Sequence, residues 1–339
     1  MMLTEETLRS LPKIELHVHL DTSVRPRTVG DLARQIGLPV PEDLNSALIA
    51  PPICHNLADY LTRVDLALQV LQTAPALERV AYELVQDMAA ESLVYAEIRY
   101  APQLCTRRGL SMQQVIDAVA AGLRAAREDF GVRTGQIICC LRHDPSALSH
   151  EVAQYAIANW APGKVVGLDL AADEAVYGGI PHRTAFRLAR GVGMPCTVHA
   201  GEAANAESVR EAIEELGAQR IGHGVHLQQD PSLFAPIRAQ HIALEMCPTS
   251  NVQTRAVKSL AQHPIDRYLK YDVPVTVNTD GRTTSNTTLT KEHLSLVRQF
   301  GWGLAELQQV ALTAAASAFV SAEEREDFRH TILARWPQA

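Results

Sequence analysis

No uninterrupted apolar run in this 339-residue sequence approaches the roughly 20 residues that a membrane-spanning helix needs. The opening stretch, MMLTEETLRSLPK, lacks the apolar core and the small-residue cleavage site of a secretion signal. Basic residues gather in no patch or tail and the net charge is −7, so nucleic-acid binding finds no support. The six cysteines show no C-x-x-C spacing, which predicts reduced, buried thiols in a cytoplasmic protein.

Sequence motifs of several enzyme classes are absent as well. The chain holds no G-x-S-x-G elbow, no P-loop and no H-E-x-x-H, since His150–Glu151 lacks the second histidine. The H-x-E…P-C-x-x-C pattern of the cytidine-type zinc deaminases is missing. No G-x-G-x-x-G follows an apolar run, which argues against a dinucleotide-binding sheet.

Short apolar runs rich in β-branched residues recur along the chain, and segments of helical period separate most of them. A chain of this length is long for one core unless the fold is one that runs large. Eight strand–helix units predict an α/β fold, a closed (β/α)8 TIM barrel, with an open doubly wound sheet as the alternative. The predicted strands are 14–20, 94–100, 136–141, 165–170, 195–199, 220–223, 242–246 and 274–279.

The helical segments carry both periodicity and end signals. Apolar residues in 77–88 recur at helical spacing. Ser111 and Gln114 form a capping box that opens a helix over 112–130, and Gly131 closes it. Two further helices are predicted over 206–216 and 304–320.

The connection between the first and second predicted strands, residues 23–75, is much longer than the others. Its pattern predicts extra helices and a loop containing APPICHN. An insertion after a barrel strand lies at the C-terminal face, where barrel active sites lie. We therefore expect this segment to cover the pocket and contact the substrate. Because no linker, repeat or low-complexity stretch interrupts the chain, residues 1–339 are predicted to form a single domain.

Side chains that carry chemistry gather at the ends of four predicted strands. Alternate residues of a strand share a face, so the histidines of PKIELHVHLD are placed to hold one metal ion. All strand ends of a parallel barrel meet at one mouth, which brings distant residues into one pocket. The candidates are His17, His19, Asp21, His199 and Glu202 of HAGE, His223 of GHG, and Asp280 of NTDG.

Three imidazoles and a carboxylate form a ligand set that suits Zn²⁺. Glu202 lies three residues after His199, a suitable place for a proton-transfer group. A single metal is favoured, because the fourth strand ends in LDLAADE without a bridging lysine and Lys164 lies at its other end. Helix caps and buried histidines are the structural alternatives, and the occurrence of four such features together argues against them.

Seven motifs carry a family resemblance: PKIELHVHLD, RHDP, DLAADE, HAGE, RIGHG, EMCPTSN and VNTD. In order and spacing, over about 12–320, they resemble the adenosine deaminase family. The resemblance implies a barrel of the amidohydrolase type and hydrolytic deamination of a 6-aminopurine nucleoside such as adenosine. It also implies one Zn²⁺ per subunit, held by His17, His19, His199 and Asp280.

The resemblance also assigns roles in catalysis and binding. Glu202 would donate a proton to the purine ring, and His223 with Asp280 would position the attacking water. Asp21 would hydrogen-bond the sugar. The implied substrate-binding positions are His19, Asp21, Ala172 and Gly281.

Three positions depart from the family pattern. Thr22 replaces a glycine, Ala172 replaces a glycine whose N–H meets purine nitrogen 3, and Gly281 replaces a carboxyl that contacts purine nitrogen 7. All three concern the substrate and none concerns the metal. The alternatives left open are therefore a nucleoside extended at its 5′ end, such as aminodeoxyfutalosine, and free adenine.

Functions of other classes also compete with the deaminase reading. A zinc hydrolase of an amide or phosphoester would have no need of a protonated Glu202. A non-catalytic purine-nucleoside binding protein would not need the complete set of ligands and proton-handling residues. The expected partner is a small-molecule purine nucleoside, with no nucleic acid and no membrane, and the oligomeric state is left open.

Overall fold

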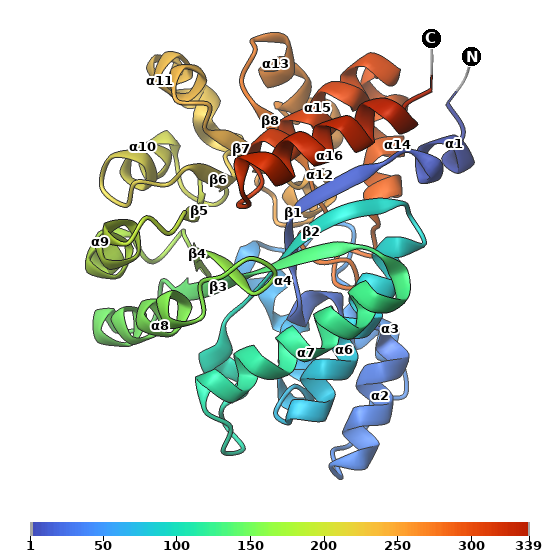
Figure 1. Cartoon of the computed structure of the whole chain (residues 1–339), viewed down its shortest axis with the longest axis vertical. Helices are drawn as coiled ribbons and strands as arrows, with labels where there is room; N and C mark the ends of the chain where they lie inside the picture. The colour runs from blue at the N-terminus through green and yellow to red at the C-terminus, as the bar shows by residue number, and fades with distance from the viewer. Residues whose placement is uncertain (1–2, 338–339) are drawn as a thin grey trace.

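The computed structural model describes residues 3–337 and shows strands and helices alternating along the chain (Figure 1). The strands lie where the apolar runs predicted them, within a few residues at each end. They are β1 (Lys13–His19), β2 (Leu93–Tyr100), β3 (Arg133–Leu141), β4 (Val165–Ala171), β5 (Thr197–Ala200), β6 (Arg220–His223), β7 (Ala243–Met246) and β8 (Val275–Val277).

The strands form two parallel half-sheets, in the orders β1-β2-β3-β4 and β5-β6-β7-β8. Single parallel bridges join the halves at both seams, Leu168 with Cys196 between β4 and β5, and Val18 with Asp280 beside β8. The sheet therefore returns to its first strand, and the predicted (β/α)8 barrel is confirmed. The open doubly wound sheet does not form.

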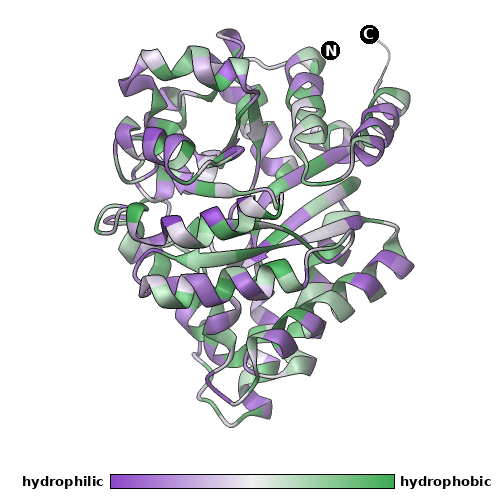
Figure 2. Cartoon of the chain, turned by 60° about the vertical axis from the view of Figure 1, so that its left-hand side comes forward, coloured by the Kyte–Doolittle hydropathy of each residue, from purple (hydrophilic) through white to green (hydrophobic). Residues whose placement is uncertain are grey.

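Helices surround the barrel, and their colours follow one another around it in chain order (Figure 1). Figure 2 shows polar and apolar residues mixed along these helices, as expected where one face packs on the strands. The helices outside the 23–75 segment are α1 (Glu5–Ser10), α6 (Ala74–Ala89), α7 (Met112–Phe130), α8 (Ser146–Ala158), α9 (Arg183–Gly191), α10 (Ala206–Glu214), α11 (Phe234–Ala239), α12 (Pro248–Gln253), α13 (Ile265–Lys270), α14 (Leu289–Phe300), α15 (Leu304–Ser317) and α16 (Ala322–Arg335).

Local signals set several helix ends. The capping box of Ser111 and Gln114 forms as predicted, and Gly131 takes a left-handed conformation after α7. Helix α10 stops two residues short of the predicted 216, and α15 stops at Ser317 instead of 320. Beyond α15 the Phe319 N–H bonds to the buried Glu97 carboxylate, a tertiary contact that no local pattern reveals.

The long connection after β1 folds into short helices, as predicted. These helices are α2 (Pro26–Gln35), α3 (Leu44–Leu48), α4 (Leu57–Leu61) and α5 (Asp65–Val70).

No helix among residues 3–337 is long and apolar enough to span a bilayer.

Candidate active site

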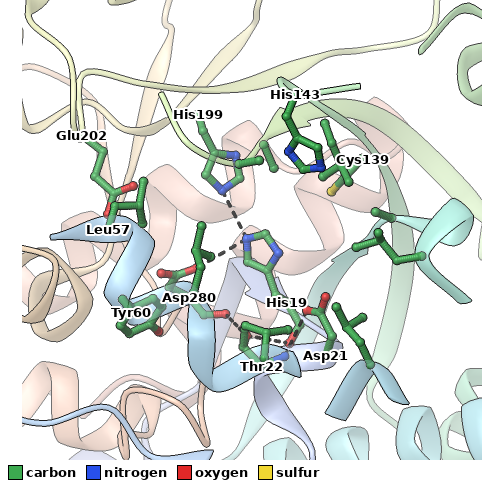
Figure 3. A pocket seen from close by; sticks show the side chains of 18 of the residues that line it. His19, Asp21, Thr22, Leu57, Tyr60, Cys139, His143, His199, Glu202 and Asp280 are labelled. Atoms are coloured by element: carbon green, nitrogen blue, oxygen red, sulfur yellow. Dashed lines mark hydrogen bonds and ion pairs between the residues drawn. The ribbon is translucent and has the colours of Figure 1, made fainter. Parts of the chain in front are cut away.

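The predicted site residues meet at the C-terminal mouth of the barrel (Figure 3). His17 and His19 come from β1, His199 from β5 and His223 from the end of β6. The ring centroid of His17 lies 4.6 Å from that of His199 and 4.7 Å from that of His223. Asp280 follows β8, and its backbone bonds to β1. Residues more than 250 positions apart are thus in contact.

The spacing of the donor atoms fits one metal ion. His19 Nε2 lies 3.2 Å from His199 Nε2 and 3.4 Å from Asp280 Oδ1. His17 Nε2 lies 3.5 Å from the same Asp280 oxygen. An ion held tetrahedrally at about 2.0–2.1 Å from each donor separates the donors by about 3.3 Å. The histidine and aspartate set predicted from the sequence therefore has the geometry of a zinc-type site.

The hydrogen bonds of His17 and His199 leave lone pairs directed at this point. His17 Nδ1 donates to Glu245 at 2.9 Å, and His199 Nδ1 donates to Asp169 at 3.1 Å. Within residues 3–337, the buried His17 Nε2 has no hydrogen-bond partner. A buried nitrogen acceptor without a partner is costly, and a cation would satisfy it.

His223 also lies within this cluster, since His17, His199, His223 and Asp280 offer ligand atoms that all lie within 4.8 Å of one another. Its tautomer can be deduced from a chain of hydrogen bonds. The Ile265 N–H donates to His263 Nδ1, so His263 Nε2 donates to Asn251 Oδ1. The amide of Asn251 then donates to His223 Nδ1 at 3.0 Å.

Burial lowers the pKa of His223 well below its ordinary value, so the ring is neutral. With Nδ1 accepting, the single proton of His223 lies on Nε2, which points into the site. A protonated nitrogen is no metal ligand. Of the two remaining imidazoles, His19 is therefore the better third nitrogen ligand, and His223 is a hydrogen-bond donor.

A buried ion network lies beneath the histidines. Arg99 bonds to Asp169 at 3.0 Å and to Glu245 at 2.7 Å, and these carboxylates are the ones that orient the histidines. Arg220 bonds to Glu245 at 2.6 Å and also pairs with Glu97. The side chains of all five residues are at most 1% exposed. Every charge in this network has a partner, as burial requires.

Glu202 lies on the loop after β5, and a second carboxylate shapes that loop. The side chain of Glu174 accepts hydrogen bonds from the backbone N–H groups of residues 201–204 at 2.6 to 3.2 Å. Glu202 Oε2 lies 3.5 Å from His223 Nε2, and Thr254 donates to Oε1 at 3.0 Å. Burial, with the nearby charges of Asp280 and Glu174, raises the pKa of Glu202 well above its ordinary value. Both effects favour the protonated form of this carboxyl, which is the form that a proton donor requires.

Three residues at the mouth adopt the left-handed backbone conformation, which is rare outside glycine. They are Ala172, with φ of 81°, His223, with φ of 65°, and Asp280, with φ of 62°. Strained backbone of this kind gathers at functional sites. At Ala172 the strain marks a position whose backbone favours the glycine that the family pattern carries.

A cavity of about 300 Å³ opens over the cluster. His19, Asp21 and Ala172, three of the four positions that the resemblance assigns to substrate binding, line it. The 23–75 segment forms one wall, as expected, and contributes apolar side chains at helical spacing. Among the described residues that line this cavity there is no lysine or arginine. The lining from this segment is Leu57, Tyr60, Leu61, Val64, Asp65 and Leu68.

Several residues that build the site were not identified from the sequence. Glu174 stands in DLAADE, and its position after β4 was a usable signal. Asp169 and Glu245 are charged residues inside apolar strands, a pattern that predicts buried pairing but not which partner. Tyr60 lies in a helix whose sequence has no distinguishing motif. Gly281, the fourth position assigned to substrate binding, packs beside Thr22 and is not among the described residues that line the cavity.

Comparison with known proteins agrees with this geometry. A model of the adenosine deaminase family matches residues 12–335. The adenosine deaminase of Enterococcus faecalis is 39% identical over 325 residues, covering 95% of this chain and 96% of that protein. The adenine deaminase of Arthrobacter aurescens is 27% identical with a TM-score of 0.88, covering 96% of this chain and 98% of the other. An Arabidopsis ADAL complexed with GMP is 26% identical with a TM-score of 0.88, covering 98% and 99%.

Proposed function

The chain belongs to the adenosine deaminase family, and on that premise we propose that it converts adenosine to inosine and ammonia with one Zn²⁺ per subunit. The family and its relatives make the chain a hydrolytic deaminase of adenosine-type substrates. One observation carries the proposal. The buried carboxyl of Glu202 lies 3.5 Å from His223 Nε2, beside a cluster of histidines and an aspartate with metal-ligand spacing.

The proposed ligands are His17, His19, His199 and Asp280. The orphaned His17 Nε2 and donor separations of 3.2–3.5 Å support this set. Deaminases of this family are metal-dependent, and borderline nitrogen donors with one carboxylate favour zinc among the divalent ions. A zinc ion in this place would lower the pKa of a water molecule and so supply a nucleophile at neutral pH.

The proposed reaction adds water to purine carbon 6 and expels the amino group. Glu202 gives its proton to ring nitrogen 1 as the water oxygen bonds to carbon 6. The Nε2–H of His223 donates a hydrogen bond that orients the water, and Asp280 accepts the water proton. That proton passes to the amino group, which leaves as ammonia when the bond from carbon to nitrogen breaks. The proton that remains on the oxygen returns to Glu202 as the carbonyl forms. Ser250 donates to Asp280 Oδ2 at 2.7 Å and holds this carboxylate in place.

The lining of the cavity favours a nucleoside over a nucleotide. Of the described residues around it, the charged ones are carboxylates and none is a lysine or arginine. A phosphate at the 5′ end would meet Asp21 and the exposed Asp65 without a cation to pair with. Although the Arabidopsis relative was crystallised with GMP, we propose that this chain discriminates against nucleotides.

We further propose that the whole chain acts as one catalytic domain, because strands from both half-sheets contribute to the cluster. The free, buried state of all six cysteines supports the expectation of a reducing, cytoplasmic environment. The proposed partner is the small-molecule substrate.

The test is a substrate panel on protein of measured zinc content, with ammonia release as the readout. The panel holds adenosine, 2′-deoxyadenosine, AMP, adenine, 5′-methylthioadenosine and aminodeoxyfutalosine. The expected result is the highest kcat/KM for adenosine or 2′-deoxyadenosine and a much lower value for AMP. If a 5′-extended nucleoside or adenine is turned over faster than adenosine, that compound is the substrate and the adenosine assignment is wrong. No ammonia from any compound, despite bound zinc, would overturn the proposal.

A further inference from the structure

Position 281 has no room for a side chain. A Cβ atom built on Gly281 would lie 2.7 Å from both Cβ and Oγ1 of Thr22. It would also lie 3.0 Å from the hydroxyl oxygen of Tyr60. Contacts below 3.0 Å are not tolerated between such atoms, so Thr22 and Tyr60 occupy the space next to this backbone. Two of the three departures from the family pattern, Thr22 and Gly281, therefore belong to one packing arrangement.

Tyr60 reaches this point from α4, in the segment that covers the barrel mouth. The residue is 2% exposed, yet it lines the cavity. Its hydroxyl lies 2.7 Å from Ser285 Oγ. Burial raises the pKa of Tyr60 well above its ordinary value, so the hydroxyl keeps its proton. A hydroxyl has one proton to donate and also accepts hydrogen bonds, so Ser285 occupies only part of its capacity.

The position of Tyr60 relative to Glu202 determines which substrate atom it faces. In Figure 3, Glu202 lies above Asp280 and Tyr60 lies below it. In the proposed function, purine carbon 6 lies at Asp280 and ring nitrogen 1 faces Glu202. Nitrogens 1 and 7 lie on opposite sides of carbon 6. The wall opposite Glu202 therefore faces nitrogen 7, an acceptor that needs a donor when it is buried.

We propose that the Tyr60 hydroxyl donates a hydrogen bond to purine nitrogen 7 and accepts one from Ser285, which makes Tyr60 a specificity-determining residue for the purine ring. This inference rests on the proposed function and adds a contact to it. Tyr60, on the segment that covers the mouth, would supply the contact to nitrogen 7 that a side chain at position 281 has no room to make.

The neighbouring hydroxyl of Thr22 is not placed to take this role. Its Oγ1 lies 3.4 Å from the carbonyl oxygens of both His19 and Asp280. Its proton is thus directed at backbone acceptors. Tyr60 is the neutral donor of this wall that faces the cavity.

Tyr60→Phe removes the hydroxyl and keeps the ring. The test measures kcat/KM for adenosine and the inhibition constant of 7-deazaadenosine, in which a C–H replaces nitrogen 7. Losing one hydrogen bond and leaving its acceptor buried weakens binding of the substrate or its transition state by about 5- to 150-fold. The expected result is a fall of that size in kcat/KM for adenosine, with the inhibition constant of 7-deazaadenosine unchanged within about twofold.

The control variant is Tyr82→Phe. The hydroxyl of Tyr82 donates to Asp129 on the outer helices and lies away from the cavity. It should change neither quantity. An equal loss of adenosine and 7-deazaadenosine binding in Tyr60→Phe would overturn the inference, because the hydroxyl would then act only through packing. If the wild-type protein releases no ammonia from adenosine, the proposed function fails. The inference is then decided by whether Tyr60→Phe weakens binding of adenosine and spares that of 7-deazaadenosine.

Discussion

Two walls of the same cavity are built in different ways. The metal wall consists of His199, which lines the cavity, with His17 and the carboxylates and arginines packed behind it. Each of its buried charges has an opposite charge within hydrogen-bond distance. The recognition wall consists of Thr22, Tyr60 and Ala172, which are neutral and are placed by packing and local backbone conformation.

The difference between the walls indicates which parts of the site have freedom to vary. A change in the metal wall leaves a buried charge without its partner, which costs several kcal/mol. A change in the recognition wall costs packing or one hydrogen bond, and a neighbouring side chain has room to compensate. The departures from the family pattern all lie in or beneath the recognition wall. None of the three departures removes a partner from the buried ion network.

The largest effect is expected from removing the proton donor. In Glu202→Gln, kcat for adenosine should fall about 10²- to 10⁴-fold, because the amide has no acidic proton for ring nitrogen 1. Binding should persist, since glutamine keeps the shape, an N–H donor for nitrogen 1 of adenosine and a carbonyl acceptor for the N1–H of inosine. Steady-state kinetics and inhibition by inosine measure the two effects. Equal loss of turnover and inosine binding would mean that Glu202 serves binding rather than proton transfer.

The metal wall should be the less tolerant of the two to substitution. Glu245→Gln leaves Arg99 and Arg220 short of a buried negative charge, so unfolding should become easier by about 3–5 kcal/mol. Metal affinity should fall about 10- to 100-fold, because His17 loses its orienting carboxylate. Denaturant titration and competition with a chelator measure these quantities. The matched control is Glu326→Gln, because Glu326 forms an exposed ion pair with Arg329. This variant should change neither the free energy of unfolding nor the metal affinity.

The recognition wall should show compensation between neighbours. Gly281→Ala places a methyl group against Thr22 and should destabilise the protein by about 1–3 kcal/mol. Adding Thr22→Gly should recover most of that loss. A double-mutant cycle on the free energy of unfolding measures the coupling. Additive effects would contradict the shared packing arrangement at these two positions.

The smallest effect concerns backbone strain. At Ala172, with φ of 81°, Ala172→Gly should stabilise the protein by up to about 1 kcal/mol, because relief of the left-handed strain exceeds the entropy of glycine. Ala171→Gly, in the adjacent position of β4, should instead destabilise by about 0.5–1 kcal/mol. Thermal melts compare the pair. Destabilisation by both substitutions would refute the strain argument.

The barrel and the centre of the site could be predicted from the sequence, because both depend on local patterns. Apolar runs and capping residues locate the strands and α7, and the parallel barrel then brings the strand ends together. The C-terminal ends of α10 and α15 could not be predicted from local patterns. The end of α15 depends on Glu97, a residue about 220 positions away that accepts from Phe319 N–H.

The supporting residues were harder to predict for the same reason. The roles of Glu174, Glu245 and Tyr60 depend on partners supplied by other elements. A carboxylate in an apolar strand predicts a buried partner, but the partner is known only once the barrel closes. From the sequence, Tyr60 is predicted to be an ordinary core aromatic residue. Only the position of α4 at the barrel mouth shows that Tyr60 lines the cavity. Thr22 and Gly281 were predicted as separate departures, and the structure places them in contact.

The most direct test of this account compares His19→Ala with His223→Ala by metal content per chain and adenosine turnover. The hydrogen-bond chain through Asn251 and His263 puts the His223 proton on Nε2, so His19 completes the ligand set. The account predicts that His19→Ala loses both metal and activity, while His223→Ala keeps about one zinc per chain and loses only activity. Loss of metal from His223→Ala with retention in His19→Ala would contradict it.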